Sequence, residues 1–164
     1  MARIVDLGVT TYSWVPTIAD VTAPTPTELT AGTNITPQVV TTTTVGAAAS
    51  DTVSERSVAD TSNVVTPTVG NYEGTLVLFR DFDAGVPSAS DPLTVITPGE
   101  VGYLVRRIGK AHDEPFAAGD IVEVYKFIPD NPVLAGGAGD GYLKATYTMH
   151  PQGAFTVDAA VTGV

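Results

Sequence analysis

The sequence feature that most constrains the fold is an apolar run at residues 121–128, which reads IVEVYKFI. It follows the turn pair Gly119-Asp120 and consists mostly of β-branched and aromatic residues, which suit a half-buried pleated surface. The segment PDNP at 129–132 ends the run, because proline cannot donate to a strand ladder. We therefore predict a strand at 121–128, around which the other strands pair.

Several other segments share this β-prone character. Val- and Thr-rich or alternating stretches predict strands at residues 34–45, 71–82 and 101–108, with a turn at 46–50. Residues 142–149 and 154–161 each alternate apolar and polar positions, and the sequence HPQG between them predicts a hairpin turn. About seven strands at this spacing predict a mainly β fold, an antiparallel β-sandwich or half-barrel.

One or two short helices are expected to flank the sheets. Thr25 precedes Pro26, and Glu28 follows three residues after Thr25, which is the pattern of a capping box with proline at the first helical position. Gly32 keeps this helix brief. The sequence Ser90-Asp91-Pro92 predicts a second short helix over about 93–96.

The length of 164 residues predicts a single domain. Residues 1–24 are rich in turn residues and are interpreted as an extended N-terminal arm, which either folds back on its own domain or reaches a neighbour. Residues 46–72 form a long hairpin or loop region in which both strand faces are mixed, so we expect a hairpin that extends away from the core.

Composition narrows the function classes. Hydrophobic residues make up 43% of the chain and charged residues only 16%, so the chain is not disordered and its surface is sparsely charged. The net charge of −10 argues against tight binding of nucleic-acid phosphates, which requires clustered Lys and Arg. No signal peptide and no apolar run of membrane-spanning length are present, so we expect synthesis in the cytoplasm and no membrane partner.

The sequence contains no pattern that specifies a catalytic, cofactor or metal site. Cysteine is absent, and His112 and His150 both stand next to turn signals without a partner at ligand spacing. The glycine-rich stretch at 136–141 fits neither the dinucleotide nor the Walker pattern. Asp81 and Asp83 resemble the start of a calcium loop whose further ligands are missing. We expect the protein not to be an enzyme.

Arg106, Arg107 and Lys110 form the one basic cluster of the sequence. It has two interpretations. One is an ion pair within the chain, to nearby acids such as Asp113 and Glu114. The other is an electrostatic contact with an acidic patch on a neighbouring subunit.

At PFAAGDIVEVYKF, together with GYLKATYTMHPQGAFTVDAAV, the chain resembles the major tail protein, or tail tube protein, of long-tailed (siphovirus-type) bacteriophages, especially those of actinobacteria. The stretches WVPTIADVTAPTPTELTAGTNIT and NYEGTLVLFRDFD resemble the corresponding parts of these proteins, so the resemblance covers most of the chain. Some members carry a C-terminal immunoglobulin-like domain, which we expect to be missing here because the sequence stops just after its last predicted strand.

The resemblance implies a virion protein that self-assembles. Six copies form a hexameric ring whose sheets join into a continuous barrel, and the rings stack into the tail tube. The implied partners are other copies of the chain, the tape measure protein, and the tail terminator and distal tail proteins. Double-stranded DNA passes through the tube during ejection without specific binding.

A conduit for DNA suits an acidic lining, because lumen carboxylates repel phosphates at short range. Glu55, Glu73, Glu123 and Asp158 each occupy a polar strand face and are the candidate lumen-facing acids, with outer-surface solvation as the alternative for each. Lys144 shares such a face and weakens a purely acidic lining.

Other functions remain open from the residues alone. A tail terminator or capsid decoration protein shares this composition and the absence of catalytic motifs. A monomeric β-sandwich binding module would require an exposed aromatic platform, whereas Trp14 and the tyrosines are scattered along the chain. A small hydrolase would require a convergent histidine–carboxylate site.

Overall fold

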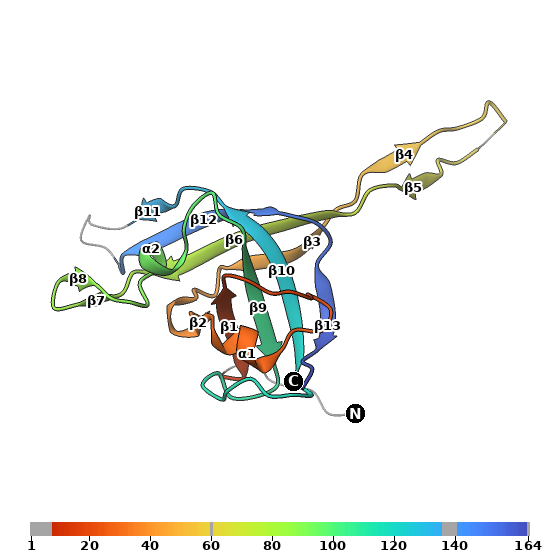
Figure 1. Ribbon diagram of the computed structural model, residues 1–164. Coiled ribbons are helices and arrows are strands. Elements are labelled where there is room, and N and C mark those ends of the chain that lie inside the picture. Colours follow the sequence, from red (N-terminus) through yellow and green to blue (C-terminus); the bar gives the residue numbers. More distant parts are fainter. Residues whose placement is uncertain (1–7, 60, 136–140, 164) are drawn as a thin grey trace.

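The computed structural model describes residues 8–59, 61–135 and 141–163 (Figure 1). Strands dominate these residues, with two short α-helices and one 3-10 helix, η1. The elements follow in chain order as β1 (Thr10–Val15), α1 (Pro26–Thr30), β2 (Thr33–Asn34), η1 (Thr36–Gln38), β3 (Thr44–Ala48), β4 (Thr52–Ser54), β5 (Val65–Pro67), β6 (Asn71–Phe79), β7 (Phe82–Asp83), β8 (Val86–Pro87), α2 (Pro92–Val95), β9 (Gly102–Ile108), β10 (Ile121–Pro129), β11 (Val133–Ala135), β12 (Lys144–Pro151) and β13 (Thr156–Ala160).

The main sheet has nine strands, all paired antiparallel, and β12 divides it into two halves. Residues 144–148 of β12 pair with β6, whereas residues 149–151 pair with β10. We call β2, β1, β9, β10 and β13 the covered sheet, and β11, β12, β6 and β3 the open sheet. The two halves face each other, so the predicted antiparallel β-sandwich with short flanking helices is confirmed.

The larger hydrophobic core lies between the two sheets. It contains Trp14, Leu104 and Phe127 from the covered sheet and Leu76 and Tyr147 from the open sheet, all nearly or fully buried. Gly74 of β6 permits this contact, because a β-carbon there would lie 2.7 Å from the ring of Phe127. Close packing of this kind fixes how the two sheets face each other.

A second core lies on the other face of the covered sheet. Leu29 of α1 and Ile18 pack there against Val105, Val122 and Val124, which alternate with the residues of the first core. The covered sheet is therefore buried on both faces, whereas the open sheet is buried on one face only. The predicted capping box places α1 here: Thr25 Oγ1 accepts from the Glu28 amide at 3.3 Å, and Glu28 Oε2 accepts from the Thr25 amide at 2.8 Å.

The predicted strand at 121–128 is β10, and it pairs with β9 on one side over its central residues. The N-terminal segment is not a free arm over residues 10–15, because β1 pairs with β9 along its full length. Of the two possibilities left open by the sequence, the structure shows this part folded back on its own domain. Residues 1–7 lie outside the described residues.

The predicted hairpin of residues 142–149 and 154–161 is wrong. β12 and β13 do not pair with each other; both pair antiparallel with β10, at Phe127–Pro129 and Ile121–Val124 respectively. They therefore run in the same direction along one edge of β10, as a single strand interrupted at residues 152–155. Gly153, at φ +119°, lies in this interruption, and the β-bulge lies further along, where the register of β13 shifts between Val122 and Val124 of β10.

The predicted strand at 34–45 and the turn at 46–50 are also wrong. Ile35 is buried, Pro37 lies in a short 3-10 helix, and β3 begins only at Thr44 and continues to Ala48. Gly46, Ala47 and Ala48 have weak strand preference, and they extend β3 because β6 offers them a hydrogen-bonding edge.

Two hairpins leave the sandwich at opposite ends of β6 (Figure 1). The longer one, residues 49–70, carries β4 and β5 and continues the β3–β6 pair outward; we call it the ribbon. The shorter one pairs β7 with β8 just after the end of β6. The ribbon is the extended hairpin expected from the mixed strand faces of residues 46–72.

Candidate functional site

The described residues contain no group of three or more His, Asp or Glu side chains placed to hold a metal ion. His150 lies 3.7 Å from Asp130 Oδ2 on the exposed surface, and His112 is exposed in the loop after β9. None of the helices in the described part of the chain is long and apolar enough to cross a membrane.

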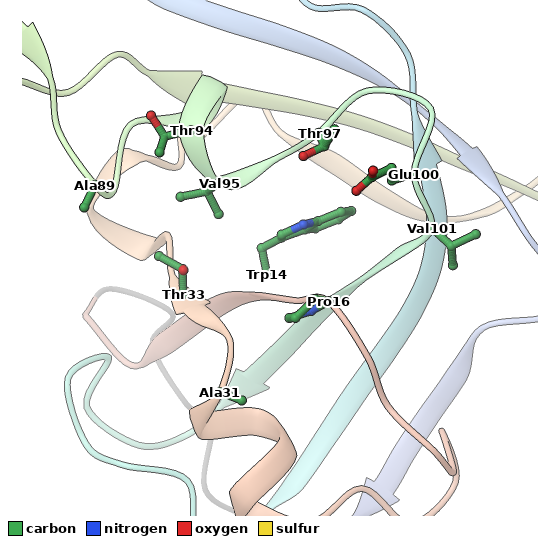
Figure 2. A pocket seen from close by; sticks show the side chains of 10 residues that line it. All are labelled: Trp14, Pro16, Ala31, Thr33, Ala89, Thr94, Val95, Thr97, Glu100 and Val101. Atoms are coloured by element: carbon green, nitrogen blue, oxygen red, sulfur yellow. The ribbon is translucent and has the colours of Figure 1, made fainter.

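A pocket of about 290 Å³ lies beside Trp14 (Figure 2). The indole ring lies between Thr97 and Glu100 on one side and Pro16 on the other. Glu100 is the one ionisable side chain among the lining residues. The surfaces of the open sheet are stronger candidates for the functional site than this pocket.

The open sheet has one face whose described side chains are exposed or half-buried, with the Tyr142 ring packed edge-on against Phe79 there. Because Gly74, Leu76 and Leu78 point into the core, the alternate residues of β6 point outward, and the strand registers place their neighbours beside them. We call this surface the open face. Its residues are Thr44, Gly46, Ala48, Asn71, Glu73, Thr75, Val77, Phe79, Val133, Ala135, Lys144, Thr146 and Thr148. It is rich in threonine and carries one acid and one base.

The two edges of the open sheet are β3 and β11. Among the described residues, β3 pairs only with β6 and β11 pairs only with β12, so each presents one side of its backbone to solvent. Their sequences, TVGAA and VLA, contain neither a charged residue nor a proline. Monomeric proteins usually block such edges, because a free edge pairs with other chains.

The ribbon is solvent-exposed over its whole described length, from residue 49 to 70. Five valines on it are 49% exposed or more: Val53, Val58, Val64, Val65 and Val69. Asn71 holds its base, because Asn71 Nδ2 donates to the Ala49 carbonyl at 2.9 Å and to Asp51 Oδ1 at 3.0 Å. The ribbon therefore leaves the sheet along the direction of the β3–β6 pair.

The four candidate lumen acids do not share a surface. Glu73 lies on the open face, Glu55 on the ribbon, and Asp158 on β13 of the covered sheet. Glu123 lies on the core-facing side of β10, where its carboxylate pairs with Arg106 and accepts from the Tyr125 hydroxyl at 2.6 Å. Although burial raises the pKa of Glu123, the hydrogen bonds from Arg106 and Tyr125 lower it overall, so this acid is held ionised inside the subunit.

The basic cluster is engaged within the chain. Arg106 pairs with Glu123, and Lys110 lies 3.0 Å from Glu114 and 2.8 Å from Asp120. Arg107 is 1% exposed and its Nη1 lies 2.9 Å from Asp120 Oδ2. These contacts match the intrachain ion-pair interpretation, with Asp120 as an acid that the sequence analysis did not name.

Sequence reasoning missed the two free edges. Residues 46–48 of β3 were predicted as a turn. β11 was not predicted at all, although the apolar run Val133-Leu134-Ala135 directly after Pro132 is a usable strand signal. β3 and β11 are recognised as edges because β3 pairs with β6 and β11 pairs with β12, and the sequence does not show these pairings.

The whole sequence was compared with known protein families and proteins. The family described as "Phage tail tube protein" matches residues 1–164, which is the full chain. A comparison with curated proteins finds no match. The chain therefore belongs to the phage tail tube protein family, and it is a structural protein of the phage tail.

Proposed function

We propose that this chain assembles head to tail into hexameric rings that stack into the tail tube. The observation that carries the proposal is the pair of unprotected edges, β3 and β11, on opposite sides of the open sheet. In a ring, the β3 edge of each subunit pairs with the β11 edge of the next, so that the backbone groups of both open-sheet edges are hydrogen-bonded.

The direction of the strands supports this pairing. β11 is antiparallel to β12, β12 to β6, and β6 to β3, so β11 and β3 run in opposite directions. Rotation about a ring axis preserves strand direction along that axis. A β3 edge beside a neighbour's β11 edge therefore continues the antiparallel order without interruption. The repeated open sheets close into one barrel.

The open face lines the lumen of this barrel. The covered sheet already has α1 and Ile18 on its outer side, so it forms the outside of the tube, and the open sheet faces the bore. Glu73 and Lys144 are the two charged residues of the open face, and the rest is mainly threonine and small apolar residues. Tight DNA binding requires several clustered cations, so DNA slides past a lining of this kind.

The same proposal includes the remaining partners. The bore surrounds the tape measure protein before ejection and conducts double-stranded DNA afterwards, and tail terminator and distal tail proteins close the two ends of the tube. Glu73 is the lumen acid in this arrangement. Glu55 lies on the ribbon, which reaches toward an adjacent ring.

Electron microscopy of the purified chain at high concentration tests the proposal, together with two edge variants. Ala47→Lys on β3 and Leu134→Lys on β11 place a charge on each free edge, at positions that are exposed in the subunit. Wild-type protein should form rings or tubes with an open bore, whereas each variant should stay monomeric with an unchanged circular dichroism spectrum.

The matched control is Thr30→Lys, which adds the same charge at the exposed end of α1. It should assemble like the wild type. Wild-type protein that stays monomeric at every concentration, or edge variants that assemble as well as the control, would contradict the proposal.

A further inference from the structure

The covered sheet also has two edges, β2 and β13. Among the described residues, β2 pairs only with β1, and β13 pairs only with β10 (Figure 1). β2 consists of Thr33 and Asn34 alone, so it offers little edge to a partner strand. β13 has five residues, as many as β3, and it is therefore long enough to pair with another chain.

β13 contains a β-bulge. The register of β13 shifts between Val122 and Val124 of β10. Two residues of β13, Val157 and Asp158, therefore lie opposite one residue of β10, Glu123. A bulge bends its strand and increases the local twist, so the outer N–H and C=O groups of β13 lose the regular spacing that a partner strand requires.

Asp158 adopts the unusual backbone conformation of this bulge. Its φ is +59°, in the left-handed region, and Ala84 is the other non-glycine residue with a positive φ among the described residues. Aspartate enters this region more readily than most residues, but it is disfavoured in strands. The Asp158 side chain is exposed. β13 therefore combines an extra residue and a charge, which are both known ways of keeping an edge strand unpaired.

Asp158 opposes each way in which β13 could pair with another copy. It is the central residue of the strand, so two β13 strands paired antiparallel about their centres would place the two Asp158 carboxylates opposite each other. Like charges directly opposite are destabilising. Pairing with the uncharged β3 or β11 edge of another copy would take the same carboxylate out of water without giving it a counter-ion.

We infer that Asp158 determines which edges of the subunit pair, by blocking β13 while β3 and β11 stay open. This inference rests on the proposed function, in which subunits join through free sheet edges. A subunit with a third long edge open would join its neighbours in more than one geometry, whereas a closed ring requires a single geometry. Asp158 is thus a specificity-determining residue for assembly.

The test uses the full-length chain with Ala47→Lys and Leu134→Lys together, which places a charge on each edge of the open sheet. We call this variant the blocked background. Deletion of Asp158 in it removes the charge of β13 and the extra residue of the bulge at the same time. The concentration at which half of the chains associate, measured by sedimentation, should fall at least about tenfold relative to the blocked background. Circular dichroism should show unchanged strand content.

Asp158→Asn in the blocked background provides a second variant. Asparagine tolerates a positive φ as aspartate does, so this substitution removes the charge and keeps the bulge. It should also lower the half-association concentration, but by less than the deletion does. The matched control is Asp113→Asn, which removes the same charge from the exposed loop between β9 and β10 and should leave that concentration unchanged.

A charge returned to β13 locates the contact. Val157 is 60% exposed and lies in the bulge. Adding Val157→Lys to the deletion variant should make it monomeric again, because the same edge then carries a charge. Thr30→Lys adds the same charge at the exposed end of α1 and should leave the association of the deletion variant unchanged.

The outcomes separate this inference from the proposed function. The inference is overturned when neither folded variant of Asp158 associates more readily than Asp113→Asn, or when Val157→Lys does not reverse the association. If the deletion variant does not fold, Asp158→Asn decides by the same criterion. A blocked background that still forms rings contradicts the proposed function instead, because β3 and β11 then do not join the subunits.

Discussion

The guanidinium of Arg107 lies 2.9 Å from the carboxylate of Asp120, and the two side chains are 1% and 3% exposed. Arg107 also donates to the carbonyls of Ala111, Glu114 and Pro115, so one buried cation organises the loop between β9 and β10. Asp120 in turn accepts from the Ala117 amide at 3.1 Å. The centre of this loop is therefore a buried ion pair instead of an apolar side chain.

We expect Asp120→Asn to destabilise the subunit by about 3–5 kcal/mol, because it leaves the Arg107 charge buried without its counter-ion. The control is Glu114→Gln, which removes an exposed partner of Lys110 and should change stability by less than about 1 kcal/mol. Urea unfolding followed by circular dichroism measures both in the Ala47→Lys background, which should be monomeric. Equal effects of the two substitutions would contradict a special role for the buried pair.

The Arg107–Asp120 ion pair should also make the free energy of unfolding depend on pH in the acid range. Burial raises the pKa of Asp120, but hydrogen bonds from Lys110, the Ala117 amide and Arg107 outweigh it, so the pKa is lowered in the folded state. Its stabilisation is therefore present above the unfolded value of about 3.9 and is lost as pH falls through the lower folded value. The stability difference between wild type and Asp120→Asn should be constant from pH 5 to 7 and shrink below pH 4.

Thr25→Ala should cost about 1 kcal/mol, because it removes the side-chain cap of α1. Thr27→Ala is the matched control, since Thr27 is an exposed threonine in the same helix whose side chain does not cap it. Thermal unfolding of both variants measures the difference. A cost at Thr27 as large as that at Thr25 would show that helix propensity, and not the cap, sets the effect.

Gly102→Ala should be strongly destabilising. A β-carbon at Gly102 would lie 2.2 Å from Cζ2 of Trp14, whose indole packs directly on the β9 backbone. Overpacking of this kind costs about 1–3 kcal/mol or more. Gly46→Ala in β3 is the control, because nothing lies within 4 Å of its β-carbon position. In chemical unfolding, the free energy of unfolding of Gly102→Ala should be well below that of the wild type, and that of Gly46→Ala should be close to it.

Tyr147→Phe should lower stability at neutral pH and should reduce the loss of stability at alkaline pH. The Tyr147 hydroxyl donates to the Pro92 carbonyl at 3.1 Å, so its removal should cost about 1 kcal/mol at pH 7. Burial, followed by the Asp91 charge, raises the pKa of Tyr147 to about 12.

The neutral phenol is therefore favoured by folding, and its contribution is lost as pH rises from about 10, the unfolded value, to about 12. Stability measured across that range should fall less steeply in Tyr147→Phe than in wild type. Tyr142→Phe, at an exposed position, serves as the control and should follow the wild-type curve.

Local patterns predicted several elements well. The β-branched run at 121–128 is β10, and the Thr25–Glu28 spacing is a capping box at α1. Asp91 before Pro92 caps α2, as expected from a side-chain acceptor followed by proline. These succeed because the causes lie within a few residues of each other along the chain.

Predictions that depended on which strand or side chain a segment contacts were less successful. Alternation in residues 154–161 was read correctly as a strand, but its partner is β10 and not β12. Glu123 was predicted to lie on a polar strand face, but that face of β10 also carries the core residues Tyr125 and Phe127, and the Glu123 carboxylate pairs with Arg106. Arg107 is likewise buried because β9 is covered on both faces.

The sequence by itself therefore determined the strand-rich class, the helix caps and the absence of any recognisable catalytic pattern. Tertiary structure alone decided which edges stay free, which face of β6 stays open, and where the ribbon lies. The reason is physical: side-chain periodicity shows which residues share a face. Only the packed sheets show what covers that face and which backbone groups of β3 and β11 remain to be paired.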